Sequence, residues 1–496
     1  MNSASKRDVL VGLAALGLSG VGSGTAHAAQ SAAPSKSIVL SGANVLYEVV
    51  ARPTQILDPQ GELLGEMFSF SYLGRAGGGS QRPVLFIYNG GPGSSSVWLH
   101  LGVFGPKSLV LDAEVNPSPA PPYRLRPNPD CLLDIADLVF VDPVGTGFSR
   151  LAGKGGQDDF FGVDADAIAF ARFIEAWLTE HDRWDSPKIL VGESYGTQRS
   201  AVLTRMLMGG PTYGGALHAI TIDGVVLLGT TLESPDHGDA DRNAAVLLPN
   251  MAATAWYHQR IDRKGRSLEA FVEDAEHFAN TTFVEGLFAG AWGAEADRRR
   301  LAEQLSGFVG LAPEALLASN FRLGGPAYAK MLLSETHLET GLYDSRYTLA
   351  ATTAPEDPVG DDPAMAQYTP IFVGAWHDYL TRDLQIQRPQ PYGAIQWAGV
   401  NSRWTRTRNG VADGQSFAVD LALACRRNPK LRIFVGSGYY DLVTPFADAE
   451  LSLRTAGVPR ERVELKRYAS GHMIYLGGTA PAFARDLRRF VSEVAR

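Results

Sequence analysis

The stretch Lys188-Ile189-Leu190-Val191-Gly192-Glu193-Ser194-Tyr195-Gly196 joins an apolar run to a serine that lies between two glycines. A strand, a sharp turn that carries a serine, and a helix are the parts of a nucleophile elbow, and a segment compatible with a helix follows here. The turn is tight, so a side chain at Gly192 or Gly196 would collide with the neighbouring strand and helix. A glycine-rich turn with a solvated serine is the alternative, because 53 of the 496 residues are glycine. Residues elsewhere in the chain that could serve as base and acid must distinguish between these two interpretations.

The segments on both sides of this turn alternate between apolar runs and amphipathic stretches. Apolar runs occur at 84–88, 138–141, 220–228, 431–435 and 463–465, and helical patterns at 163–177 and 481–494. Residues 37–72 have instead the alternating pattern of β-hairpins. Continuous apolar runs are typical of strands that are buried on both faces. The sequence therefore predicts an α/β fold with a mostly parallel central sheet and helices on both faces.

The region from 233 to 400 has a different pattern, because helical periodicity dominates it and no convincing buried strand interrupts it. We interpret residues 233–400 as a helical cap that is inserted into one α/β core. The core is then expected to comprise residues 35–232 and 401–496. A single interrupted domain explains the return of the apolar strands after residue 430 better than two domains in tandem.

Residues 1–28 have the features of an export signal. Lys6-Arg7 precede an apolar stretch over 9–18, and Ala26-His27-Ala28 is a small-residue cleavage site. The apolar stretch is too short to span a membrane, and no other run is apolar enough. We therefore expect a bacterial protein that is exported, periplasmic or secreted, and not inserted in a membrane.

The composition excludes some classes of function. A net charge of −8 and a pI near 5.7 give no support to nucleic-acid binding. The only cysteines, Cys131 and Cys425, have no metal-binding spacing, and no H-E-x-x-H motif occurs. We predict no metal and no cofactor. The two cysteines could form a bridge, although two separate buried thiols are the preferred interpretation. The oligomeric state is left open.

A serine nucleophile needs a base and an acid that orients the base. Enzymes with this elbow carry the three groups in the order serine, acid, histidine. Of ten histidines only His472 follows the cap region, just after the last predicted strand. The first acid after the strand at 431–435 is Asp441, and Asp448 is the alternative acid. We therefore predict a triad of Ser194, Asp441 and His472.

The oxyanion of a tetrahedral intermediate needs two aligned donors. One is expected to be the backbone amide of Tyr195, which follows the nucleophile. The second is expected from the loop Asn89-Gly90-Gly91-Pro92-Gly93, which follows a buried strand. Glycine there lets the main chain approach a substrate, and Pro92 stiffens the loop.

At this point the chain resembles the serine carboxypeptidase family in several motifs. They are Asn89-Gly90-Gly91-Pro92-Gly93-Ser94-Ser95-Ser96, Asp142-Pro143-Val144-Gly145-Thr146-Gly147-Phe148-Ser149, Gly192-Glu193-Ser194-Tyr195 and Gly471-His472-Met473. The resemblance implies an α/β-hydrolase fold and the removal of single residues from peptide C-termini through an acyl-enzyme. It also implies that Asn89 and Glu193 bind the terminal carboxylate of the substrate, and that Gly91 and Tyr195 are the oxyanion donors.

The chain departs from the family pattern at two positions of note. Ser94 replaces a cysteine that forms a disulfide in the family, and Val103-Phe104-Gly105-Pro106 stands where family members have E-L-G-P. A second carboxyl group for terminal-carboxylate binding is therefore expected to be missing. This departure leaves exopeptidase specificity open, whereas hydrolysis itself is not in question.

Glu193 suggests a hypothesis about pH. Two carboxylates side by side cannot both be ionised without repulsion, so a proton must be shared between Glu193 and the substrate. Peptide hydrolysis is then expected to weaken as Glu193 deprotonates, whereas ester hydrolysis follows His472. A purely structural role for Glu193 in the elbow is the alternative.

Two other functions fit the same residues. An esterase or acyltransferase with a small acyl substrate would use the same scaffold, because a fold does not determine its substrate. An inactive, hydrolase-like binding protein is the third interpretation, and the intact Ser194, Asp441 and His472 argue against it. The leading prediction is a serine carboxypeptidase that acts on peptides.

Overall fold

The computed structural model describes residues 36–75, 81–111, 115–118, 120–210, 217–233, 239–354 and 357–496. The predicted export signal at residues 1–28 lies outside these described residues. Within them, every helix is either too short or too polar to cross a membrane.

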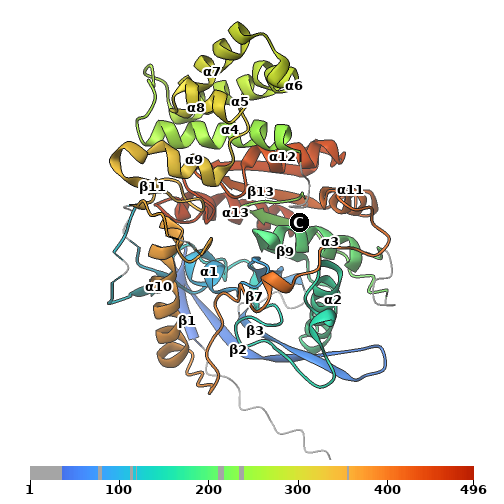
Figure 1. Cartoon of the computed structure of the whole chain (residues 1–496). Helices are drawn as coiled ribbons and strands as arrows, with labels where there is room; N and C mark the ends of the chain where they lie inside the picture. Colours follow the sequence, from blue (N-terminus) through green and yellow to red (C-terminus); the bar gives the residue numbers. More distant parts are fainter. Residues whose placement is uncertain are drawn as a thin grey trace, which may run out of the picture.

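A central sheet organises the molecule (Figure 1). Its strands follow the order β1-β2-β3-β7-β4-β9-β10-β13-β14, and β8 pairs with β3. The strands are β1 (Lys36–Leu40), β2 (Ala43–Leu57), β3 (Leu63–Gly74), β4 (Val84–Tyr88), β7 (Asp137–Val141), β8 (Arg150–Leu151), β9 (Lys188–Glu193), β10 (Gly224–Leu228), β13 (Arg432–Gly438) and β14 (Val463–Tyr468). All pairings from β7 to β14 are parallel, whereas β1, β2, β3 and β8 pair antiparallel. The predicted mostly parallel sheet is therefore confirmed.

Helices cover both faces of the sheet because successive side chains of a strand point to opposite faces. In β4, Leu85 and Ile87 belong to one apolar cluster, and Val84, Phe86 and Tyr88 to another. The first cluster includes side chains of α1 (Val97–Leu99), α10 (Pro363–Asp378) and α13 (Ala480–Val494). The second includes those of α2 (Val163–Glu180), α3 (Tyr195–Leu207), α11 (Ala418–Arg427) and α12 (Phe446–Thr455).

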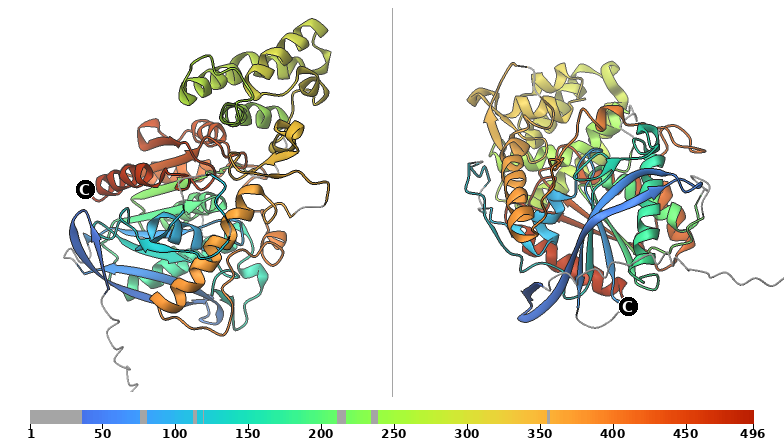
Figure 2. Two further views of the ribbon diagram at one scale, coloured as in Figure 1. Left: turned by 90° about the vertical axis from the view of Figure 1, so that its left-hand side faces the viewer. Right: turned by 90° about the horizontal axis from the view of Figure 1, so that it is seen from below.

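The stretch predicted as a helical cap contains two different parts. Helices α4 to α9 gather at one end of the molecule with an apolar core of their own, as Figures 1 and 2 show. They are α4 (Ala240–Tyr257), α5 (Leu268–Phe278), α6 (Val284–Ala289), α7 (Glu295–Val309), α8 (Pro313–Ala318) and α9 (Gly325–Leu332). Helix α10 instead packs on the sheet, since Tyr368, Phe372 and Trp376 are buried in the first cluster. We refer to α4–α9 as the helical unit.

Short strands complete the described fold. β11 (Leu338–Thr340) and β12 (Thr348–Ala350) pair antiparallel just after the helical unit, and β5 (Lys107–Leu109) pairs with β6 (Leu125–Pro127). Three residues on each side are too few for a clear signal in the sequence pattern, which explains why these strands were not predicted.

The two cysteines lie in different apolar clusters. Cys131 belongs to the cluster on one face of the sheet and Cys425 to the cluster on the other face. Both are free and buried. The interpretation as two separate buried thiols is therefore confirmed, and a bridge between them is excluded by the intervening sheet.

Candidate active site

The turn at Ser194 has the strained backbone that an exposed nucleophile requires. β9 ends at Glu193, α3 begins at Tyr195, and Ser194 has φ 60° and ψ −129°. This conformation is rare for a residue with a side chain and is found where the surrounding structure holds it. Here the Ser194 amide donates to the Leu228 carbonyl at 2.9 Å, and its carbonyl accepts from the Thr197 amide at 2.8 Å.

Close packing explains the glycines of the elbow. A methyl group at Gly192 would lie 2.2 Å from the Gly196 carbonyl oxygen, and one at Gly90 would lie 2.4 Å from the Tyr195 amide nitrogen. Both distances are far below van der Waals contact. Glycine therefore permits the loop after β4 to lie directly against the elbow.

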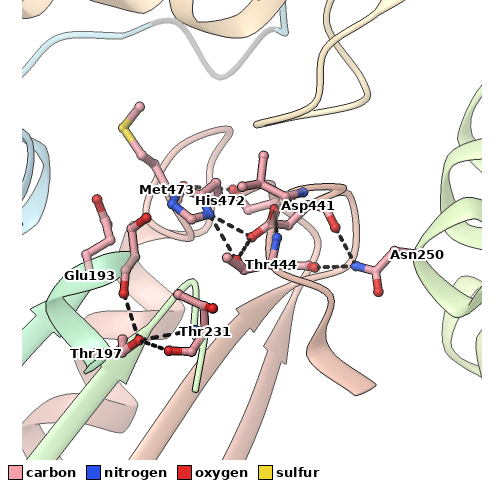
Figure 3. A network of polar contacts seen from close by, with 12 residues as sticks. Glu193, Thr197, Thr231, Asn250, Asp441, Thr444, His472 and Met473 are labelled. Atoms are coloured by element: carbon pink, nitrogen blue, oxygen red, sulfur yellow. Dashed lines mark hydrogen bonds and ion pairs between the residues drawn. The ribbon is translucent and has the colours of Figure 1, made fainter. Parts of the chain in front are cut away.

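His472 and Asp441 lie together as the sequence predicts, and Figure 3 shows their contact. The Nδ1 atom of His472 is 2.8 Å from Oδ2 of Asp441, and both side chains are buried. The other carboxylate oxygen accepts hydrogen bonds from the amides of Val443 and Thr444 at 2.8 and 2.9 Å. These bonds hold the carboxylate in place, and the carboxylate orients the imidazole ring.

The alternative acid, Asp448, has another partner. It lies on α12 and forms an ion pair with Arg242 at 2.5 Å. Asp441 is therefore the acid that contacts His472.

Thr444 and Asn250 complete this cluster, and sequence reasoning missed both. The Thr444 hydroxyl donates to Asp441 and lies 3.0 Å from Nδ1 of His472. Asn250, on α4 of the helical unit, is fully buried and donates to the carbonyl oxygens of Gly438, Tyr439 and Asp441 at 3.2, 3.2 and 2.9 Å (Figure 3). The helical unit thereby fixes the loop that carries Asp441.

Replacing Asn250 by alanine is expected to destabilise the protein by about 2–3 kcal/mol, because buried carbonyl groups lose their donors. We also expect kcat to fall about tenfold, since the loop of Asp441 becomes free to shift. Urea unfolding and steady-state kinetics measure the two effects. Thr254→Val is the matched control, because Thr254 is one helical turn away, fully buried, and bonded to Ser345 rather than to this loop. An equal loss of kcat in both variants would contradict a specific role for Asn250.

The two predicted oxyanion donors lie beside Ser194. Gly91 has φ 100°, a conformation that favours glycine, and the loop Gly90–Gly93 lines the same cavity as Ser194. Within the part of the chain that the structure describes, the amides of Gly91 and Tyr195 have no backbone acceptor. Both are therefore available to a substrate oxygen.

Asn89 and Glu193 form a buried pair next to the nucleophile. The Nδ2 of Asn89 donates to Oε1 of Glu193 at 2.6 Å, and Oδ1 of Asn89 accepts from the Leu99 amide at 3.2 Å. The hydroxyl of Tyr475 lies near the same carboxyl group and acts on its pKa as a hydrogen bond does. Asn89 and Glu193 both line the cavity that also contains Ser194.

A buried ion pair that sequence reasoning missed supports this arrangement. Arg199 on α3 bonds to Asp166 on α2 at 2.6 Å, and its other arm donates to the carbonyl of Asn89 at 2.8 Å. A buried charge is costly unless it is paired, so this contact holds α2, α3 and the Asn89 loop in one arrangement.

Burial raises the pKa of Glu193 to about 7, although nearby His472 and the hydrogen bond from Asn89 oppose the shift. Tyr475, fully buried, lies near this carboxyl, and burial raises its own pKa. For His472, burial lowers the pKa, but the Asp441 carboxylate and its hydrogen bond outweigh burial, so the net shift is upward. Glu193 and His472 influence each other, and they therefore titrate as a coupled pair.

Ser194 lies between two cavities that share Gly91, Pro92 and Ser194. The first, of about 60 Å³, contains Asn89 and Glu193 and is otherwise mostly apolar. Its apolar lining is Trp98, Tyr343, Val359, Met365, Ile395, Trp397 and Met473. The second, of about 460 Å³, contains charged and polar side chains. These are Gln198, Thr231, Glu233, Arg242, Asn243, Arg406, Thr444 and Asp448. We call them the apolar cavity and the polar cavity.

The two departures from the family pattern have clear places in the structure. Val103 is buried in the apolar cluster on one face of the sheet, and its side chain supplies no carboxyl group. The Ser94 hydroxyl accepts a hydrogen bond from the indole of Trp98 at 2.8 Å. Among the described residues, no group of three or more His, Cys, Asp or Glu side chains could hold a metal ion.

Comparisons with known proteins found one matching family model and several similar solved structures. Residues 66–287 match the sequence model of the serine carboxypeptidase family. A prohormone-processing carboxypeptidase from Saccharomyces cerevisiae has a similar solved structure, with a TM-score of 0.55 and 15% identity over 90% of this chain and 91% of the other. A proline iminopeptidase from Mycobacterium smegmatis gives a TM-score of 0.37 and 12% identity, over 90% and 99% of the two chains. A search of curated proteins found no match.

The protein thus has the α/β-hydrolase fold, as the sequence predicts. Over residues 66–287 the sequence is similar to that of the serine carboxypeptidase family.

Proposed function

We propose that the protein removes single residues from the C-termini of peptides through an acyl-enzyme on Ser194. The observation that carries this proposal is the buried pair of Asn89 and Glu193, directly beside the nucleophile. A carboxyl group that is protonated near neutral pH can share its proton with a substrate carboxylate. Such a pair therefore recognises a free chain end, which an endopeptidase does not require.

The reaction then proceeds in two stages. His472 takes the proton from the Ser194 hydroxyl, and the serine oxygen attacks the carbonyl carbon of the last peptide bond. The amides of Gly91 and Tyr195 donate to the oxygen that becomes negative. His472 next gives the proton to the nitrogen of the leaving residue, and the peptide bond breaks. A water molecule, deprotonated by His472, hydrolyses the acyl-enzyme in the same way.

The lining of the apolar cavity supports a preference for the leaving residue. Asn89 and Glu193 lie in this cavity, so the C-terminal residue enters it together with its carboxylate. The surrounding side chains include Trp98, Trp397 and Met365. Burial of apolar surface stabilises a complex by about 25 cal/mol per Å². We therefore expect bulky apolar C-terminal residues to be removed fastest.

A short series of peptides with a blocked N-terminus and a free C-terminus tests the proposal. Peptides that end in leucine or phenylalanine are expected to have kcat/KM values about ten- to a hundredfold above those that end in aspartate or lysine. The matching C-terminal amides are expected to react at least about a hundredfold more slowly, because they cannot share the proton of Glu193. Mass spectrometry of the products measures both differences. Equal rates for the acids and the amides would refute a carboxypeptidase.

One observation favours a second candidate, an esterase or acyltransferase. Val103 provides no carboxyl group where the family pattern has one, so Glu193 binds the chain end without that partner. Fast hydrolysis of simple esters, together with equal rates for peptide acids and amides, would favour this alternative.

A further inference from the structure

The polar cavity adjoins the apolar cavity at Gly91, Pro92 and Ser194, which line both. If the C-terminal residue of a peptide occupies the apolar cavity, the residue before the cleaved bond must extend into the polar cavity. This step rests on the proposed function. The polar cavity is also the larger of the two, at about 460 Å³ against about 60 Å³, so it has room for a long side chain.

Most of the charge in the polar cavity is matched within the protein. Arg242 on α4 forms ion pairs with Asp448 at 2.5 Å and with Glu233 at 3.6 Å. These three side chains are mostly buried. The two acids therefore have a cation between them and offer little attraction to a basic substrate.

Arg406 differs from the other charged groups of the polar cavity. Its side chain is half-buried and lines the cavity together with Ser194 and Tyr195. Across the described ranges of the chain, no hydrogen bond or ion pair holds its guanidinium group. The guanidinium group cannot lose its charge at ordinary pH, so an unmatched positive charge faces the polar cavity.

The backbone around Arg406 is firmly held. The Thr405 amide donates to the Phe161 carbonyl at 2.9 Å, and the ring of Trp404 packs edge-on against Tyr195 at 5.1 Å. On the other side, buried Arg408 forms an ion pair with Asp420 at 2.7 Å. Since both neighbouring segments are fixed, little backbone order has to be gained when a ligand binds Arg406.

We propose that Arg406 binds an acidic side chain of the residue before the cleaved bond, so that the enzyme favours glutamate or aspartate at that position. A carboxylate matches the planar donor fork of the guanidinium group. The paired acids Glu233 and Asp448 lie in the same cavity, and their pairing with Arg242 reduces the repulsion that such a substrate would meet.

Blocked peptides that end in Glu-Leu, Gln-Leu and Lys-Leu test this specificity. For the wild type we expect kcat/KM for Glu-Leu to exceed that for Gln-Leu by about five- to tenfold, as for a partly solvated charge pair. Arg406→Gln should bring the ratio close to one, and Arg406→Glu should invert it and make Lys-Leu the better substrate. Arg403→Gln is the matched control, because Arg403 is an exposed arginine of the same segment that does not line the cavity.

The outcomes separate this inference from the proposed function. If the peptides are cleaved but the wild type shows no preference for Glu-Leu, or if Arg406→Gln keeps the preference, the role of Arg406 is refuted and the carboxypeptidase stands. If the peptides are not cleaved, alkyl esters of N-acyl glutamate and N-acyl glutamine replace them, because their acyl residues enter the same cavity. Equal rates for these esters would refute the inference as well. A charge-based preference should also shrink at high ionic strength.

Discussion

Replacing Ser194 by alanine is expected to lower kcat on both peptides and esters by at least about 10⁴-fold. The hydroxyl is the only group at the turn that can form the acyl-enzyme, and loss of one triad member leaves only binding and oxyanion stabilisation. Steady-state kinetics, or single turnovers if the rate is very low, measure the loss. A fluorophosphonate probe should label the wild type and leave Ser194→Ala unlabelled.

Double replacement provides the stricter test. His472→Ala alone should cost nearly as much as Ser194→Ala, and the double variant should be little worse than either, because the residues of a triad act as a unit. Thermal unfolding checks that each variant is folded. Residual activity of a tenth or more in Ser194→Ala, in folded protein, would exclude Ser194 as the nucleophile.

The pH dependence of peptide hydrolysis is expected to differ strongly from that of ester hydrolysis. The pKa of Glu193 is raised to about 7. In the proposed function its protonated form donates a hydrogen bond to the substrate carboxylate, and the fraction of this form declines above that pH. One titrating group gives a slope of about tenfold per pH unit, so kcat/KM for peptides should fall about tenfold for each pH unit well above pH 7. Esters without a free carboxylate should show no such fall.

At low pH both substrates should lose activity together, because protonated His472 cannot act as a base. The pKa of His472 is raised, so this loss begins above the usual range of histidine. The pKa of Glu193 depends on four neighbouring side chains, those of Asn89, Asp441, Tyr475 and His472. The apparent pKa values of the pH–rate profile therefore belong to the coupled groups together.

Glu193→Gln is the matched variant for the pH profile, because glutamine keeps an acceptor oxygen for Asn89 and cannot ionise. Its peptide activity should lack the alkaline fall, and it should exceed that of the wild type above about pH 8. An alkaline fall that persists in Glu193→Gln would show that another group controls it.

The sequence predicts much of this site because the signals are local. Continuous apolar runs such as Val84–Tyr88 indicate buried parallel strands, and the ends of such strands meet at one edge of a sheet. Ser194, Asp441 and His472 each follow a predicted strand, so their order along the chain was enough to bring them together. The structure places His472 against Asp441 at 2.8 Å, in agreement with that expectation.

Contacts between segments that are far apart in the sequence leave no local pattern from which they could be predicted. Asn250 lies on a helix of the inserted unit, and nothing in its neighbours along the chain indicates that it holds the Asp441 loop. The ion pair of Arg199 with Asp166 and the packing of α10 on the sheet are of the same kind. Each depends on how helices pack, which a single sequence pattern does not specify.

The sequence by itself thus determined the parallel sheet, the serine turn and the contact of Asp441 with His472, because strand burial and turn chemistry depend on adjacent residues. Only the tertiary structure decided that Glu193 is buried enough to have a pKa of about 7. It also decided that Arg406, which has no hydrogen bond or ion pair among the described residues, lines a cavity together with Ser194. The burial of a side chain and the pairing of its charge depend on all of its neighbours in space, and those neighbours come from segments hundreds of residues apart.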